Sequence, residues 1–316
     1  MERNSTSHLV NDSVSYKARS THGPLKAFLV SIRIDQWTKN FILFAALVFG
    51  GQLLNTAALV QSSIAFLVFC SLSSAMYLLN DVADQTEDRR HPTKRLRPIA
   101  AGTLSPTLAV LGAVLLGVTG ITIGFFLSTA FGIVAAAFLG LLILYSHWLK
   151  FVIIIDVIAI GVGFVLRAMA GALAIDVPIS QWLLMCTILL ALFLGCAKRR
   201  HELTTLGDEA SLHRKTLSEY RPEFLDQLLS ILAGSTIVTY IFYTIDPTTI
   251  KNIGTDWITI TLLFPIYGIF RYMHLIRLEN SKGNPSDILL SDRPLLTCIV
   301  LWVLTVAVII YHPFLL

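Results

Sequence analysis

The sequence predicts an all-α protein with about nine membrane-spanning helices. Of the 316 residues, 55% are hydrophobic and only 14% are charged, whereas a soluble domain carries about 25% charged residues. The mean hydropathy is +0.71. The apolar residues come in runs of about 20, the length of a helix that crosses the hydrocarbon core of a bilayer. These observations exclude a soluble globular fold.

The helices can be placed in order along the chain, because polar or turn-forming residues bound each apolar run. The third and fourth are separated only by a short turn near Ser128. No segment between spans is long enough to fold alone, so residues 25–316 are predicted to form one transmembrane domain. Residues 1–24 are polar and rich in Ser and Thr, which predicts a flexible cytoplasmic tail. The predicted spans are 36–54, 60–80, 105–127, 129–146, 152–175, 180–198, 224–245, 257–277 and 294–314.

The distribution of Lys and Arg predicts the orientation, because cytoplasmic segments of membrane proteins carry an excess of both. With a cytoplasmic N-terminus, all but two of the 24 bases lie at or near the inner segments. Lys251 falls outside and Arg167 falls deep within a span. We therefore expect the N-terminus and the charged loops on the cytoplasmic side of the inner membrane, with the C-terminus outside.

The segment between the second and third predicted spans contains a candidate metal site. Asp81, Asp84 and Asp88 follow one another at i, i+3 and i+7, so on a helix they share one face. Three converging carboxylates repel one another unless a cation joins them, and hard oxygen ligands beside phosphate groups suit Mg²⁺. The bases that follow, among them Lys94 and Arg97, suit the phosphates. The alternative is a solvated loop of mixed charge.

Two charged residues lie in the fifth predicted span, where lipid would not tolerate them. An Arg near the bilayer centre costs about 3 kcal/mol on insertion scales, so Arg167 is expected to face the protein interior and to have a partner. Asp156 lies three helical turns earlier on the same face. One interpretation places Arg167 on a phosphate and Asp156 in a second acidic or metal-associated position. The alternative is a structural ion pair within the span.

Further candidates for substrate binding lie where polar segments meet the spans. Each has a structural alternative: Lys39, Tyr145 and Lys150 are also typical membrane-interface anchors, and positive-inside anchoring alone predicts bases such as Lys198. Asp292, by contrast, is interpreted as the N-cap of the last helix. The candidates are Lys39, Asn80, Lys94, Arg97, Tyr145, Lys150, Lys198, Arg199 and Glu202.

These motifs together resemble the UbiA superfamily of intramembrane prenyltransferases. N-D-x-x-D-x-x-x-D after the second helix resembles the first aspartate-rich motif of that superfamily. The other matching segments resemble the branch that transfers a phosphoribosyl group to a lipid phosphate. They are RIDQWTKN at 33–40, HPTKRLRPIAAG at 91–102, YSHWLK at 145–150 with Asp156, GFVLRAMAG at 163–171, KRRHE at 198–202 and LLSDRPLL at 289–296.

The resemblance implies a UbiA-like helix bundle that is a Mg²⁺-dependent enzyme. The implied donor is phosphoribosyl pyrophosphate (PRPP), and the implied acceptor is a polyprenyl phosphate of the decaprenyl type. Pyrophosphate would be released, and the lipid product would supply arabinose donors for the cell wall. Asp81, Asp84 and Asp88 would hold the metal and carry the catalysis. Lys198, Arg199 and Arg167 would hold the 5-phosphate of the donor.

One departure from the superfamily pattern favours this donor. Members that prenylate aromatic rings carry a second acidic motif on the loop after the sixth helix. Here the loop 198–223 is basic, and its only paired acids are Asp208 and Glu209. A prenyl diphosphate held between two metal clusters would need more carboxylates, whereas a sugar donor with an additional phosphate needs bases.

Two alternatives remain at this point. The first is a UbiA-type aromatic polyprenyltransferase with a prenyl diphosphate donor, and the missing second acidic motif argues against it. The second is a cation or anion transporter, but the acids lie at a membrane boundary and the halves of the chain show no convincing repeat. The sequence does not indicate a nucleic-acid partner. Both a monomer and a homo-oligomer are compatible with it.

Overall fold

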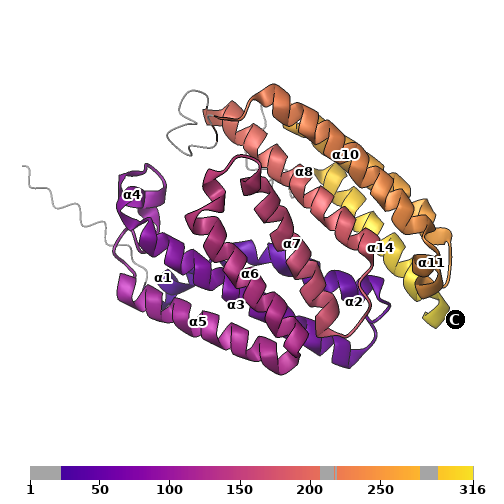
Figure 1. The fold of residues 1–316 in the computed structure, drawn as a ribbon, viewed down its shortest axis with the longest axis horizontal. Helices are drawn as coiled ribbons and strands as arrows, with labels where there is room; N and C mark the ends of the chain where they lie inside the picture. Colours follow the sequence, from indigo (N-terminus) through magenta and orange to yellow (C-terminus); the bar gives the residue numbers. More distant parts are fainter. Residues whose placement is uncertain (1–22, 207–216, 218, 278–290, 316) are drawn as a thin grey trace, which may run out of the picture.

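A computed structural model describes residues 23–206, 217, 219–277 and 291–315. All regular structure in these ranges is helical, and the helices pack side by side in a bundle (Figure 1). Nearly all of the predicted tail, residues 1–24, lies outside the described residues, as do Asp208 and Glu209. The all-α, polytopic fold class is confirmed.

In the described part of the chain, eight helices are long and apolar enough to cross a membrane. They coincide with the last eight predicted spans, so the hydropathy pattern located them correctly. The last but one begins as the 3₁₀ helix η6 (Trp257–Leu262). It continues as α12 (Leu263–Arg277). The other seven are α3 (Thr56–Ala83), α5 (Pro106–Leu127), α6 (Thr129–His147), α7 (Ile155–Ala174), α8 (Gln181–Leu206), α10 (Pro222–Ile245) and α14 (Arg293–Leu315).

The short turn predicted near Ser128 separates α5 from α6. Ser128 is extended, with φ −165° and ψ 155°, so the α-helical hydrogen bonding stops there. Its hydroxyl accepts a hydrogen bond from the backbone N–H of Phe131 at 3.1 Å and caps α6. The third and fourth spans are therefore two helices.

The first predicted span, 36–54, is not a continuous α-helix, and this part of the prediction was wrong. The chain forms α1 (Pro24–Ser31), the 3₁₀ helix η1 (Ile34–Phe44) and α2 (Ala45–Phe49) instead. Arg33, between α1 and η1, has the left-handed φ of 53°, which ends α1. The hydroxyl of Ser74 on α3 donates to the Ile32 carbonyl at 2.9 Å and accepts from the Trp37 indole at 3.1 Å. These bonds hold the break against α3.

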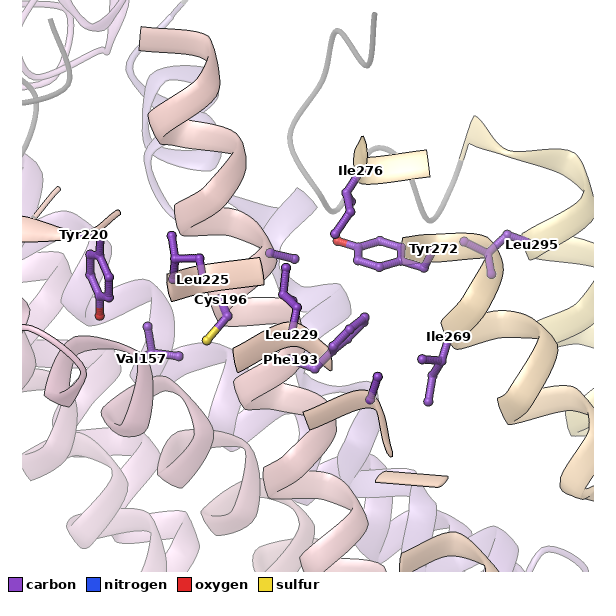
Figure 2. Close-up of a cluster of buried hydrophobic side chains, with 12 residues drawn as sticks. Val157, Phe193, Cys196, Tyr220, Leu225, Leu229, Ile269, Tyr272, Ile276 and Leu295 are labelled. Carbon is purple, nitrogen blue, oxygen red and sulfur yellow. The ribbon is translucent and has the colours of Figure 1, made fainter. Parts of the chain in front are cut away.

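Two of the four apolar clusters among the described residues have the most members and form most of the core. Figure 2 shows one of them, in which Val157 of α7 and Phe193 of α8 pack with residues of α10, α12 and α14. The other joins η1, α3, α6 and α7, with Phe69 and Phe138 in contact at a ring distance of 4.7 Å. The remaining short helices lie between the long ones in the chain: α4 (Gln85–Arg90), η2 (Lys94–Leu96), η3 (Leu149–Phe151) and α11 (Pro247–Ile253).

Replacing Gly171 by Ala is expected to destabilise the protein by about 1–3 kcal/mol. A Cβ atom at this position would overlap the backbone carbonyl of Leu43 on η1, and backbone cannot move aside as a flexible side chain can. The free energy of unfolding in detergent measures the effect. Gly140→Ala is the matched control, because a Cβ there meets nothing within 4 Å. An equal loss of stability in both variants would contradict this explanation.

Candidate active site

The acidic motif spans the end of one helix and the start of another. α3 ends at Ala83, Asp84 follows as its C-cap, and α4 begins at Gln85. The N–H of Asp84 donates to the carbonyls of Asn80 and Val82, which tightens the last turn. The three residues therefore do not lie on one continuous α-helix, although Asp81 and Asp88 still converge on a common side chain.

Arg97 brings two of the three carboxylates together. Its Nη1 atom lies 3.2 Å from Oδ1 of Asp81 and 2.7 Å from Oδ2 of Asp88. Both Asp side chains are 3% exposed. Arg33 also donates to Asp81, from its left-handed position after α1, and stacks over the ring of Tyr77 at 4.8 Å. The two carboxylates thus share a buried cationic environment.

The same residues fit a divalent cation in donor chemistry. Among the residues that the structure describes, no three His, Cys, Asp or Glu side chains are grouped closely enough to hold a metal. Asp81 and Asp88, however, both contact the same nitrogen atom of Arg97, so a cation already lies between them. Asp84 is only half-buried and follows Asp81 by one helical turn. These hard oxygen donors are the kind that Mg²⁺ prefers.

Arg167 is buried at 8% exposure, but the structure gives it no carboxylate partner in the described part of the chain. Its Nε atom donates to Oδ1 of Asn40 on η1 at 2.7 Å. Its guanidinium carbon lies 4.5 Å from the ring centre of Phe138 and 5.2 Å from that of Phe164. The alternative interpretation, an ion pair with Asp156 within α7, is therefore not found in the described structure, and Arg167 keeps a net positive charge in the interior.

Two lysines extend this positive region. Lys39 of η1 lies within electrostatic range of three bases, Lys198 on α8, Arg167 on α7 and Arg33, and of one acid, Asp35. Both lysine side chains remain exposed. Lys198 has an acidic neighbour, because its Nζ atom lies 3.9 Å from Oε1 of Glu202. Three candidates from separate parts of the sequence thus come together around an excess of positive charge.

Asp156 and Arg199 form a buried structural ion pair. Nε of Arg199 donates to Oδ2 of Asp156 at 2.8 Å, and the two side chains are 2% and 0% exposed. The hydroxyl of Tyr220 donates to the other carboxylate oxygen at 2.8 Å, and Glu202 accepts from Arg199 at 2.6 Å. Asp156 and Arg199 were predicted to contact substrate. In the structure they pair with each other, because α7 packs directly against α8, and their contact with substrate stays a prediction.

Asp156→Asn is expected to lower the free energy of unfolding by about 3 kcal/mol, because it leaves a buried guanidinium with less compensating charge. Chemical unfolding in detergent measures this. Asp226→Asn is the matched control: Asp226 pairs with Arg200 at 2.6 Å, but its side chain is 34% exposed. That variant should cost less than about 1 kcal/mol. Equal effects would contradict a structural role that depends on burial.

The other candidates lie around these networks. Asn80, Lys94, Tyr145 and Lys150 are half-buried. Tyr145 is within electrostatic range of Arg199, and Lys150 lies 5.0 Å from the ring centre of Phe151. The sequence reasoning missed Arg33 and Tyr220 as members of these networks. Arg33 opens the RIDQWTKN motif, which was a usable signal, but nothing in the sequence pointed to Tyr220.

Asp292 caps α14, as predicted. Its Oδ1 atom accepts from the backbone N–H of Leu295 at 2.9 Å. Its other carboxylate oxygen lies 2.8 Å from Nη2 of Arg271 on α12, and this hydrogen-bonded pair holds the pKa of Asp292 below its usual value. Asp292 therefore joins two helices.

Comparison with known proteins identifies the family. The model of the UbiA prenyltransferase family matches residues 40–291. The chain belongs to this family. It is similar to the decaprenyl-phosphate phosphoribosyltransferase of Mycolicibacterium smegmatis, with 32% identity over 94% of this chain and 98% of that protein. The enzyme of the same name from Corynebacterium glutamicum is 32% identical over 89% of this chain and 86% of that protein.

The fold of this UbiA family member also agrees with solved structures. A UbiA homolog from Archaeoglobus fulgidus bound to GPP and Mg²⁺ superimposes with a TM-score of 0.69. The match covers 90% of this chain and 99% of that one, at 17% identity. At that identity the likeness shows the fold, and the chain is a multi-pass membrane transferase of this family.

Proposed function

We propose that the protein transfers a 5-phosphoribosyl group from PRPP to a polyprenyl phosphate and releases pyrophosphate. The observation that carries this proposal is Arg167, a buried guanidinium without a carboxylate partner among the described residues. A buried charge is costly unless something neutralises it. A bound phosphate would do so, and the donor supplies one that a prenyl diphosphate lacks.

The pyrophosphate end and the 5-phosphate end of the donor would bind different parts of the site, one acidic and one basic. The pyrophosphate end would lie against the Asp81 and Asp88 carboxylates, which need a cation between themselves and the donor. The 5-phosphate would accept hydrogen bonds from Arg167 and Lys39, with Lys198 nearby. Arg97 and Arg33, next to the carboxylates, would contact the pyrophosphate oxygens.

Mg²⁺ fits the acidic region, and Asp81, Asp84 and Asp88 are the residues that would hold it. Bound there, the metal would neutralise pyrophosphate and make it a better leaving group. Asn80 and Lys94 flank these carboxylates in the chain and are proposed to contact the same end of the donor. The remaining candidates, Tyr145, Lys150 and Glu202, would line the approach of the second substrate.

For the proposed reaction the protein mainly has to position the two substrates. The bond between C1 of the ribose and the pyrophosphate oxygen breaks, and C1 bonds to an oxygen of the lipid phosphate. Positive charge develops at C1, as in glycosyl transfer generally. The attacking oxygen is already anionic, so a strong general base is not required. The side chains of this chain bring two polyanions together without mutual repulsion.

We further propose that residues 25–316 form one catalytic domain in the inner membrane, with the acidic site facing the cytoplasm. The Lys and Arg distribution supports this orientation, and a soluble donor such as PRPP would then have direct access. The polyprenyl chain would lie in the bilayer beside the helices. The lipid product has the chemistry of a precursor for cell-wall arabinose donors.

Transfer assays with alternative donors test the proposal. Membranes that contain the protein are given ribose-labelled PRPP, Mg²⁺ and decaprenyl phosphate, and the lipid extract is analysed for label. We expect a labelled lipid that depends on all three components. Product formation only from a prenyl diphosphate and an aromatic acid would instead establish the aromatic prenyltransferase alternative.

A further inference from the structure

Arg97 occupies an unusual position between two buried carboxylates. One nitrogen atom, Nη1, bonds both Asp81 and Asp88. These are the residues that would hold the divalent cation in the proposed function. Two buried carboxylates in contact with one cation are stable, whereas the same pair without a cation would repel each other and lose their hydration. In this arrangement the Arg97 guanidinium neutralises the two carboxylates, as a bound metal ion would.

The second arginine at the site is held differently. Arg33 contacts only Asp81, is stacked on Tyr77, and follows a helix end that Ser74 fixes from α3. Arg97 lies after the short helix η2, in extended backbone with φ −62° and ψ 140°. Its side chain is 29% exposed. Arg33 is almost equally exposed, at 28%, so the two differ in their contacts: Arg33 is stacked on a ring, whereas rotation of the Arg97 side chain breaks only its bonds to the two carboxylates.

We propose that Arg97 is a resident counter-cation that exchanges places with the divalent metal. On metal binding, Arg97 gives up its bonds to Asp81 and Asp88 and turns its guanidinium to the pyrophosphate of the donor. Metal alone then binds weakly, because it must displace a bound positive charge. Metal and pyrophosphate bind cooperatively, because the metal displaces the Arg97 guanidinium from the two carboxylates and the pyrophosphate then accepts hydrogen bonds from that guanidinium. This inference rests on the proposed function, since it takes the metal site from it.

The exchange predicts that removing Arg97 strengthens metal binding, although Arg97 assists the reaction. Arg97→Gln removes a positive charge from the centre of the site while keeping a polar side chain of similar reach. Metal affinity without pyrophosphate should rise, by about tenfold or more for a unit charge a few ångströms from the metal. Pyrophosphate should also increase the metal affinity of Arg97→Gln less than that of the wild type, because the variant has no guanidinium that can turn to the pyrophosphate.

Mn²⁺ titration followed by electron paramagnetic resonance measures both quantities without turnover. Purified protein is titrated with and without inorganic pyrophosphate, and monodispersity on gel filtration checks folding. The matched control is Arg95→Gln, because Arg95 carries the same charge two positions away and is exposed. We expect the control to resemble the wild type. Arg97→Lys keeps the charge but cannot bridge both carboxylates as well, so its affinity should fall between wild type and Arg97→Gln.

The outcomes separate this inference from the function beneath it. Wild-type protein that binds no Mn²⁺ even with pyrophosphate would overturn both. Cooperative binding by the wild type, with unchanged or weaker Mn²⁺ affinity in the Arg97 variants, would overturn the exchange alone. That result would give Arg97 a structural role in joining α3 and α4. Tighter Mn²⁺ binding with reduced cooperativity in Arg97→Gln is the supporting result.

Discussion

Asp81→Asn is expected to lower the rate of the proposed phosphoribosyl transfer by a factor of about 1,000 or more, because a metal held at this position would supply several kcal/mol of charge stabilisation. The substitution removes one of the two buried carboxylates that contact Arg97 and leaves the side-chain shape unchanged. It also deprives Arg33 of its acidic partner. Initial rates with saturating PRPP and lipid phosphate measure the loss.

Glu87→Gln provides the control for Asp81→Asn. Glu87 belongs to the same charged segment but is exposed, so neutralising it should leave the transfer rate within a factor of about two of wild type. Both variants should elute as monodisperse protein in detergent. A folded Asp81→Asn protein with near-normal activity would contradict the assignment of the metal site to this carboxylate.

Arg167→Leu is expected to raise the KM for PRPP by about 100-fold, the value of a charge-assisted contact with a buried phosphate. Stability should not fall by a comparable amount, because the arginine has no carboxylate partner to leave exposed in the described structure. Replacing an uncompensated buried charge by an apolar side chain of similar size is neutral or favourable. Loss of function without loss of stability is the specific signature.

Arg271→Leu should give the opposite pattern. Arg271 lies in another span and pairs with Asp292 at 2.8 Å, so its removal should lower thermal stability and leave the KM for PRPP unchanged. Donor titrations and thermal unfolding of the same preparations compare the two variants. If Arg167→Leu unfolds at a much lower temperature and retains its KM, Arg167 has a structural role.

Much of the fold could be predicted from the sequence, because membrane spans depend on a local property. Each apolar run from 60–80 onward corresponds to a helix in the structure. The first span was less predictable. Its break depends on Ser74, a residue of the next helix, which holds the Ile32 carbonyl. Hydropathy reports the length of an apolar run but contains no information on such a contact.

In the candidate site, too, contacts between residues near one another in the chain could be predicted, whereas contacts between separate helices could not. The motif spacing identified Asp81, Asp88 and Arg97, because these residues are near one another in the chain and the structure joins them directly. The protein partners of Asp156 and Arg167 could not be predicted from the sequence. Their shared helical face made an ion pair plausible, but Asp156 bonds Arg199 on α8 and Arg167 bonds Asn40 on η1. Helical periodicity cannot reveal a partner that another helix contributes.

In the proposed reaction the 5-phosphoribosyl group of PRPP is transferred through C1 and its pyrophosphate leaves. Doubly labelled PRPP, with ¹⁴C in the ribose and ³²P in the β-phosphate, tests this directly in membranes supplied with Mg²⁺ and decaprenyl phosphate. We predict that ¹⁴C enters the lipid fraction and that an equal amount of ³²P appears in soluble pyrophosphate. Recovery of ³²P in the lipid, or no ¹⁴C there, would contradict the account.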